Sequence, residues 1–579
     1  MHKLLLFLFF TLFVVQLKAQ DISQYGKKQG IKVTGSLGAN TVTYIPIENS
    51  PTRLPFAYFL TGRLNINLYG VAVPLSFNYS NQSFNYSTPQ PFNIVGLSPT
   101  YKNVTVHLGY RNMTFSPYSL AGVQYLGTGL EVKFAEKWKV MSMYGRTRKE
   151  VNYDSLNPSR LANYRRMVGG AKLEFNSNGD KIAVSFMGGQ DQLSSLAFKP
   201  DIQNVKPEEN VVWDLEFSKL VFKKLTFTGE YARSAYTKDL RSEASTEKSA
   251  AADPLFLINK KQSTSYYNAL KAGANMNFGP FTLGAGYERI DPNYKTLGAY
   301  YFNNDLENVT LNTSMSLFHR KINIAGSVGK QHDNLNKAKL TTQTRTVGSY
   351  SLSMIPVNKV NISLSYSNFS NYMNIMPQYR TMTALTPYDN LDTLNYVQIA
   401  QSYSGSANWQ MKADKITSST LNYSTSFQQT NDKRGNTAFV AGTKVQNHNL
   451  NYAHSRTHIG LTFSLGANAN IISNTNMNNL LTGPNLNVAK TFFQKKLNAS
   501  LGTTYNLSFD KGINTSRLLS LRNNYSISFQ KKHAFNLAFV YVDSKQKEAT
   551  PTATLKTFSN MTITAGYNYT FSAGKNAAK

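Results

Sequence analysis

The chain has 579 residues, a formal net charge of +30 and no cysteine. A chain without cysteine excludes a disulfide framework, thiolate metal sites and lipidation of a cysteine side chain. Beyond the N-terminal apolar run no segment is long and apolar enough for a transmembrane helix, although aromatic residues make up 12% of the chain.

The N-terminus predicts an export signal over residues 1–19. Lys3 supplies the basic start, and Leu4–Val15 is a nearly unbroken apolar run. Ala19 is the small residue at the expected cleavage point before Gln20. Because the run is too short to span a bilayer as a helix, we expect its removal and a mature protein that has left the cytoplasm.

Polar and apolar residues alternate from about Ile31 to Phe571, a period of two that strands use. Short turns rich in breakers or charges separate pairs of these segments. We place twelve such turns at Tyr69–Gly70, Lys102–Asn103, Ala135–Lys137, Asn176–Asp180, Lys219–Lys224, Gly279–Pro280, His319–Lys321, Val357–Lys359, Ala413–Lys415, Ser455–Thr457, Phe493–Lys496 and Gln530–His533. With both chain ends on the side of these turns, they predict thirteen hairpins and about 26 strands, or about 24 if one hairpin is miscounted.

The opposite connections are longer and more polar. The clearest are Ser80–Gln90, Val151–Asn163, Gln190–Glu208, Ser234–Gln262, Asp291–Asp305, Tyr372–Asp392 and Thr430–Ala441. The connection Ser234–Gln262 is favoured as a surface loop, and the alternatives are a short helix or an inward fold that narrows a lumen.

These patterns predict an all-β fold, a single transmembrane antiparallel up-and-down β-barrel over residues 31–571. A bilayer cannot satisfy the backbone groups of an open sheet edge, so the sheet has to close on itself. The expected location is the bacterial outer membrane, as a multi-pass barrel surrounded by outer-membrane lipid. Short turns would face the periplasm and long loops the exterior, with short periplasmic segments at residues 20–30 and 572–579.

The last predicted strand, Thr562–Phe571, has an apolar, aromatic face and a polar face. It resembles the signal with which outer-membrane barrels present their final strand to the barrel-assembly machinery. The matching positions are Thr564, Gly566, Tyr569 and Phe571. An ordinary amphipathic strand is the alternative interpretation, and the barrel pattern upstream favours the insertion signal.

The alternation also assigns side chains to the lumen. In the first half of the wall, apolar residues are expected to face lipid and the charged residues between them to face inward. These lumen-facing charged candidates are His107, Arg111, Glu131, Lys133, Arg166, Lys172, Glu174, Asp214, Glu216 and Glu230. The corresponding positions of the second half are Asn, Ser and Thr. Charges of both signs can orient ionic or dipolar solutes. Alternatively, they pair across strands to stiffen the wall or to hold an inward-folded loop, which we favour.

The sequence contains no convincing catalytic, cofactor or metal motif, and we expect no enzyme activity and no cofactor. His454 and His458 straddle a predicted turn, so they lack the helical spacing of metal ligands. In a soluble protein the positive charge would suggest nucleic acid. Here many basic residues fall in the predicted turns, so a basic ring at the periplasmic end is a simpler account, and no nucleic-acid partner is expected.

A resemblance to a known family is carried by Tyr110–Gly122, which reads Tyr-Arg-Asn-Met-Thr-Phe-Ser-Pro-Tyr-Ser-Leu-Ala-Gly, and by Gly127–Gly129 after it. With Tyr69–Gly70 before and Tyr144–Arg146 after, the stretch resembles large, mostly uncharacterised, porin-like outer-membrane β-barrel proteins of Bacteroidota, and the Lys-, Asn- and Tyr-rich composition resembles Flavobacterium-like members. The resemblance implies location and fold, and a role as a pore or as part of secretion or surface-assembly machinery. It transfers no catalytic residue.

Two functional hypotheses follow. The first is a porin-like diffusion channel with a polar, partly charged lumen. The alternative is a barrel that is plugged by loops or by a partner and serves a secretion, surface-anchoring or envelope-assembly complex, with a secreted or surface protein as that partner. An unplugged lumen of this width would breach the membrane barrier, which motivates the alternative.

Overall fold

The computed structural model describes fourteen stretches of the chain. They are residues 30–50, 53–82, 92–156, 162–197, 205–245, 258–300, 303–338, 344–368, 371–374, 396–399, 401–429, 443–474 and 477–574 without 548–556. The predicted export signal lies outside the described residues. No helix in these stretches is long and apolar enough to cross a membrane.

Strands make up almost all of the described structure. In the first half they are β1 (Lys32–Glu48), β2 (Phe56–Leu68), β3 (Val71–Ser80), β4 (Ile94–Leu97), β5 (Thr100–Tyr101), β6 (Val104–Thr114), β7 (Ala121–Phe134), β8 (Trp138–Arg148), β9 (Arg166–Ser177), β10 (Asp180–Asp191), β11 (Glu209–Val221), β12 (Leu225–Thr237), β13 (Thr264–Asn277) and β14 (Phe281–Ile290). One 3₁₀ helix, η2 (Leu193–Ser195), follows β10.

The second half continues the same pattern. Its strands are β15 (Leu306–Leu317), β16 (Ile322–His332), β17 (Thr344–Val357), β18 (Val360–Ser367), β19 (Asn371–Asn374), β20 (Tyr396–Ile399), β21 (Gln401–Ala413), β22 (Thr417–Gln429), β23 (Lys444–Arg456), β24 (Leu461–Ser473), β25 (Asn478–Phe492), β26 (Leu497–Asp510), β27 (Ile513–Phe529), β28 (His533–Gln546) and β29 (Phe558–Gly574). Strands β19 and β20 form a separate two-stranded sheet.

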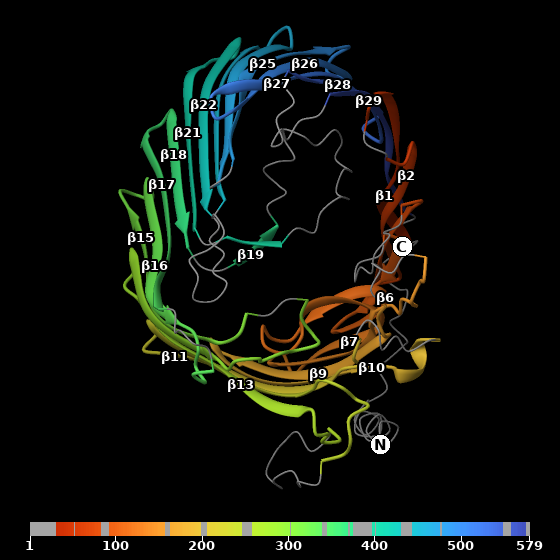
Figure 1. Ribbon diagram of the computed structural model, residues 1–579, viewed down its shortest axis with the longest axis vertical. Coiled ribbons are helices and arrows are strands. Elements are labelled where there is room, and N and C mark those ends of the chain that lie inside the picture. The colour runs from red at the N-terminus through yellow and green to blue at the C-terminus, as the bar shows by residue number, and fades with distance from the viewer. Residues whose placement is uncertain are drawn as a thin grey trace.

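The other 27 strand segments form one antiparallel sheet, in which each strand pairs with its neighbours along the chain. Strands β1 and β29 pair from Lys32 with Gly574 to Glu48 with Ser559, which closes the sheet into a ring (Figure 1). Segments β4 and β5 together occupy one strand position between β3 and β6. The strand is interrupted at Ser98–Pro99, because proline has no N–H to donate to a neighbouring strand. The barrel therefore has 26 strands, and the predicted fold and strand number are confirmed.

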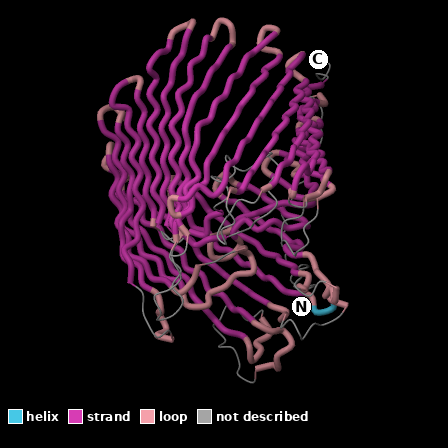
Figure 2. The backbone as a smooth tube through the Cα atoms, turned by 45° about the horizontal axis from the view of Figure 1, so that its top comes forward, coloured by secondary structure: helices cyan, strands magenta, loops and turns pink. Residues whose placement is uncertain are grey.

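The two ends of the barrel differ. Figure 2 shows tight turns gathered at one end and longer loops at the other. Each of the twelve predicted turns overlaps a turn at the first end, which we call the short-turn end. At Tyr69–Gly70 both φ angles are positive, +52° and +95°, as a two-residue hairpin turn requires. The opposite end, the loop end, carries the predicted long connections.

Register gives the wall two chemically different faces. Tyr350, Tyr366, Tyr403 and Phe427 oppose one another across β17, β18, β21 and β22, and neighbouring rings lie 4.6–6.0 Å apart. One residue further along, Ser351, Ser365, Ser404 and Ser426 oppose one another on the other side of the wall. Successive side chains of a strand point to opposite faces of the sheet. This pairing register therefore collects apolar side chains on the exposed outer face and polar side chains on the lumen face.

Candidate functional site

Two loops fold into the barrel against the lumen face of its first half. The first infolded loop is residues 115–120, between β6 and β7, and the second is residues 291–300, after β14. Figure 1 shows such segments inside the ring along the wall that includes β7, β9, β10 and β13. Leu120 and Tyr294 are fully buried between the loops and the wall. These two loops supply an inward fold of the kind considered from the sequence for Ser234–Gln262.

Residues 234–237 of Ser234–Gln262 are the end of β12, and the Ser234 hydroxyl donates to the carbonyl of Lys295 in the second infolded loop at 2.7 Å. Other described residues of the range pack against the outer face of the wall. Ala235 and Ile258 pack in one cluster with Val211 and, at its edge, with Trp213. These wall residues belong to the outer face, because Asp214 and the other lumen residues alternate with them along β11. The described part of the loop contains no helix, and residues 246–257 lie outside the described residues.

Short polar side chains hold the first infolded loop. The Ser119 hydroxyl lies 3.2 Å from the Ser185 hydroxyl on β10, and Ser185 donates to the Asp214 carboxylate at 2.7 Å. The Lys172 ammonium donates to the carbonyl of Phe115. Since all of these wall groups project into the lumen, charges that would otherwise face water are used to anchor the loop.

The second infolded loop packs on the first. The Tyr294 hydroxyl donates to the Tyr118 carbonyl at 2.8 Å, and the Thr296 hydroxyl donates to the Ser119 carbonyl at 2.6 Å. The backbone N–H of Ala121 donates to the carbonyl of Gly298 at 2.9 Å. These bonds satisfy backbone groups that burial would otherwise leave unpaired.

Apolar side chains fill the space beneath the two loops. Met113, Phe115, Leu120 and Tyr294 belong to one buried cluster with residues of the wall such as Val212. Tyr118 lies in the same cluster, and its hydroxyl donates to Glu288 at 2.6 Å. Burial and the nearby Glu288 carboxylate raise the pKa of Tyr118 above its ordinary value, so the phenol keeps its proton and remains the donor.

An ion network ties the second infolded loop to the loop end of the wall. Arg166 contacts Asp191 through two bonds of 2.8 and 2.9 Å and reaches Glu208 at 2.5 Å. Lys295, from the second infolded loop, contacts the other oxygen of Glu208 at 2.5 Å. Burial alone would raise the pKa of Glu208, but Arg166 and Lys295 more than offset it and lower the pKa to about 2.

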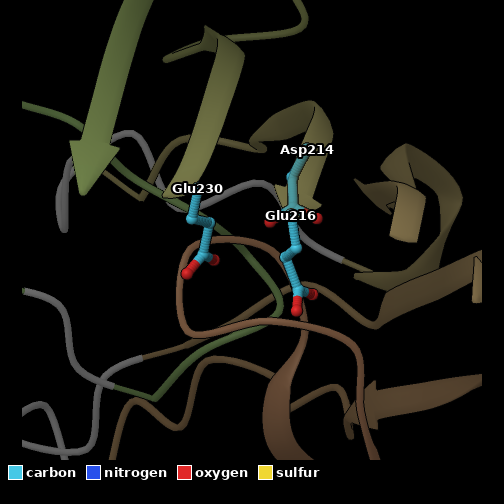
Figure 3. A group of neighbouring side chains, drawn as sticks. All are labelled: Asp214, Glu216 and Glu230. Atoms are coloured by element: carbon cyan, nitrogen blue, oxygen red, sulfur yellow. The ribbon is translucent and has the colours of Figure 1, made fainter. Parts of the chain in front are cut away.

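Three wall carboxylates lie close together beneath the first infolded loop (Figure 3). One oxygen each of Asp214, Glu216 and Glu230 lies within 4.8 Å of the others. Both oxygens of Glu216 already contact ammonium groups, those of Lys172 and Lys181. The cluster therefore forms part of an ion-paired wall, and proximity of carboxylates alone does not define a metal centre.

The remaining sequence candidates lie nearer the start of the barrel. His107 contacts Ser98 at 2.9 Å and Glu131 at 3.2 Å, and Glu131 also contacts Lys139 at 2.8 Å. Arg111 donates to the Ser76 hydroxyl at 3.0 Å and does not join this group. Lys133 is exposed on the lumen face.

The structure places the ten charged candidates on the lumen face, but they belong to separate groups of contacts. Arg166 belongs to the Glu208 network, Lys172 and Glu216 to the ion-paired wall with Glu174, and His107 with Glu131 to a third group. Sequence reasoning missed the partners in loops and at strand ends. These partners are Tyr118, Arg148, Asp191, Glu208, Glu288 and Lys295. The Ser-Pro-Tyr-Ser run at 116–119 was the available signal, since it interrupts the alternation with a turn.

The neutral half of the wall borders open space. A cavity of about 710 Å³ lies along β15–β18 and β21–β23. Hydroxyl and amide side chains such as Ser351, Ser363, Ser404 and Asn447 line it, and none of its lining residues is charged. Facing serines hydrogen-bond across strands, as between Ser365 and Ser404 at 2.6 Å. The infolded loops therefore cover the charged half of the lumen wall. Uncharged polar groups border the cavity along the other half.

Fold and lumen together define a large closed β-barrel with a polar interior. No family model and no curated protein matches the chain. Among solved structures it is similar to the FrpB iron transporter from Neisseria meningitidis, at 10% identity over 95% of this chain and 82% of that one, with a TM-score of 0.34. It is also similar to the ferric enterobactin receptor PfeA mutant from Pseudomonas aeruginosa (9% identity, 94% and 80% covered, TM-score 0.41) and to the translocation pore of the P pilus usher PapC (11%, 93% and 99%, TM-score 0.28). At these values we draw no functional argument from the similarity, and the resemblance to a Bacteroidota family stays a prediction.

Proposed function

We propose that the chain is an integral outer-membrane β-barrel that acts as a porin-like diffusion channel with a partly covered lumen. The observation that carries the proposal is the contrast between the two faces of the closed wall. Outside, Val309 and Leu311 are each 57% exposed, and Leu364 is 48% exposed. An apolar face of this extent is unfavourable in water and favourable against lipid, while the polar lumen favours water.

Membrane insertion also accounts for closure. In a bilayer every strand edge must be paired, and the pairing of β1 with β29 leaves the sheet without a free edge. The interior of a 26-strand barrel is far wider than that of a small barrel, whose own side chains fill it. The infolded loops occupy the side of β7–β14, and the cavity along β15–β23 offers the path for solutes.

The alternative is a membrane-embedded component of a secretion, surface-anchoring or envelope-assembly complex. The observation that favours it is the pair of infolded loops, which narrow a lumen wider than small solutes require. A secreted or surface protein would be the partner, and a protein that co-purifies with the barrel in stoichiometric amount would support this function.

Planar-bilayer conductance of the detergent-extracted protein tests the channel. The matched variants replace residues 292–299, in the second infolded loop, or residues 153–156, in the loop between β8 and β9, with a short Gly-Ser linker. We expect steady current from the intact protein, a larger current from the first variant and an unchanged current from the second. Current from the 292–299 variant alone would mean a barrel closed by its loops. Absence of current from all three proteins would contradict the channel function.

A further inference from the structure

Among the described strand residues, the charged side chains that are fully exposed on the lumen face are basic. Several basic side chains are exposed on the lumen face, and none of them has an ion-pair partner among the described residues. They are Lys32, Arg63, Lys133, Lys271 and Arg522. Arg63 pairs in register with Ser76, the serine that Arg111 contacts from inside the barrel. Arg522 follows Leu521, an apolar residue of the outer face that is 38% exposed, so Arg522 points to the lumen.

Lys271 shows how the carboxylates of the lumen face are kept away from an exposed basic residue. In register it lies between Glu230 and Glu288, where cross-strand pairing would be expected. Glu288 instead accepts the Tyr118 hydroxyl at 2.6 Å, and Glu230 lies with Asp214 beneath the first infolded loop. Lys271 remains exposed.

The other lumen acids of the first half are also covered or neutralised. Asp214 is fully buried. Glu216 contacts two lysines, Asp191 contacts two arginines, and Glu131 contacts Lys139 and His107. A solute in the lumen therefore meets uncovered ammonium and guanidinium groups, while the carboxylates lie behind the infolded loops or in ion pairs.

The second half of the wall adds no negative charge around its cavity. The cavity along β15–β23 is lined without a charged side chain, so hydroxyl and amide groups leave the positive potential in place. Inside a low-dielectric wall, charges of one sign raise the local concentration of counter-ions. Rings of Arg and Lys act in this way in anion and phosphate pores.

We propose that the lumen is anion-selective and that its solutes carry carboxylate or phosphate groups, a substrate class that rests on the proposed channel function. Infolding of residues 115–120 and 291–300 creates the selectivity, because it covers acids and leaves Arg63, Lys271 and Arg522 facing the lumen. Without the loops, a wall charged with both signs would have little preference.

Reversal potentials across a KCl gradient test the proposal. In about 0.1 M salt we expect the wild-type channel to prefer chloride over potassium about 3-fold or more. In about 1 M salt the preference should shrink, because the Debye length falls from about 10 Å to about 3 Å. The combined variant Arg63→Gln, Lys271→Gln, Arg522→Gln, which leaves Lys32 and Lys133 in place, should lower the ratio toward about 1. A control with Lys330→Gln, Lys444→Gln and Lys490→Gln removes three positive charges from the outer face and should keep the wild-type ratio.

The outcomes separate this proposal from the channel function. Conductance without chloride preference, or with potassium preference, would overturn the anion selectivity and leave the channel standing. An unchanged ratio in the lumen variant would overturn the assignment to these three residues. Retained single-channel conductance in the variant verifies that the barrel has folded. Absence of current from the wild-type protein would overturn the channel and the selectivity together.

Discussion

Glu208 is the residue on which the second infolded loop depends most directly. Its two carboxylate oxygens contact cations from different parts of the chain, Arg166 of β9 and Lys295 of the loop. The folded pKa of about 2 lies below the ordinary value of a glutamate, about 4.3. A carboxylate with a lowered pKa stabilises the folded state above its unfolded pKa, and this stabilisation is lost as the pH falls toward the folded pKa.

Acid should therefore loosen the second infolded loop between about pH 4.5 and pH 2. The measurement is amide hydrogen exchange of residues 294–298, expressed as protection factors so that the intrinsic pH dependence cancels. Glu208→Gln should lower protection at neutral pH by about 30-fold, since a hydrogen bond to a charged group contributes about 2 kcal/mol. It should also abolish the acid-dependent part of the change.

Glu150 offers the matched control for this experiment. Arg165 hydrogen-bonds its carboxylate and lowers its pKa to about 2, as in the case of Glu208, but the pair lies in the loop between β8 and β9. Glu150→Gln should change exchange near residues 149–156 and leave residues 294–298 protected. Equal loss of protection at 294–298 in both variants would contradict a specific role of Glu208.

At the scale of elements, the two infolded loops meet through their backbones. A Cβ atom added to Gly298 would lie 2.4 Å from the Ser119 carbonyl oxygen and 3.0 Å from the Leu120 Cα. Backbone atoms cannot yield as a flexible side chain does, so Gly298→Ala should separate the loops at a cost of about 1–3 kcal/mol. Chymotrypsin should then cleave near Tyr118 or Tyr294, which are buried in the wild-type protein.

Gly188 of β10 provides the control, because an added Cβ meets no atom within 4 Å. Gly188→Ala should keep the wild-type resistance to chymotrypsin. If Gly298→Ala is equally resistant, the loops adjust without opening and their close backbone approach does not hold them in the barrel.

Strands and turns could be predicted from the sequence because their signals are local. The period of two along a strand, and residues that tolerate positive φ at turns such as Tyr69–Gly70, depend on neighbours in the chain. The infolded loops depend on contacts between distant residues, such as Tyr294 with Tyr118. Alternation places Glu288 on the lumen face, but it does not reveal that Tyr118 covers it.

At the scale of the whole molecule, closure joins the two ends of the described chain. Strand β29 pairs with β28 on one side and with β1 on the other, so the last strand completes the ring. Tyr569 and Phe571 project from its outer face, where the rings of Tyr569 and His533 lie 4.8 Å apart. Thr564 and Gly566 lie on the lumen face of the same strand. Their role as an insertion signal stays a prediction.

If β29 is recognised by the assembly machinery, the combined variant Tyr569→Ala, Phe571→Ala should lower the amount of inserted barrel several-fold. The measurement is the heat-modifiable electrophoretic mobility of the protein in outer-membrane fractions. Tyr366→Ala with Tyr403→Ala is the control, because this outer-face pair has rings 4.6 Å apart in the middle of the wall. It removes comparable aromatic contact with lipid and across strands. A similar loss in both variants would assign the effect to lost aromatic packing, whereas loss confined to the last strand would identify β29 as the part of the chain recognised before the ring closes.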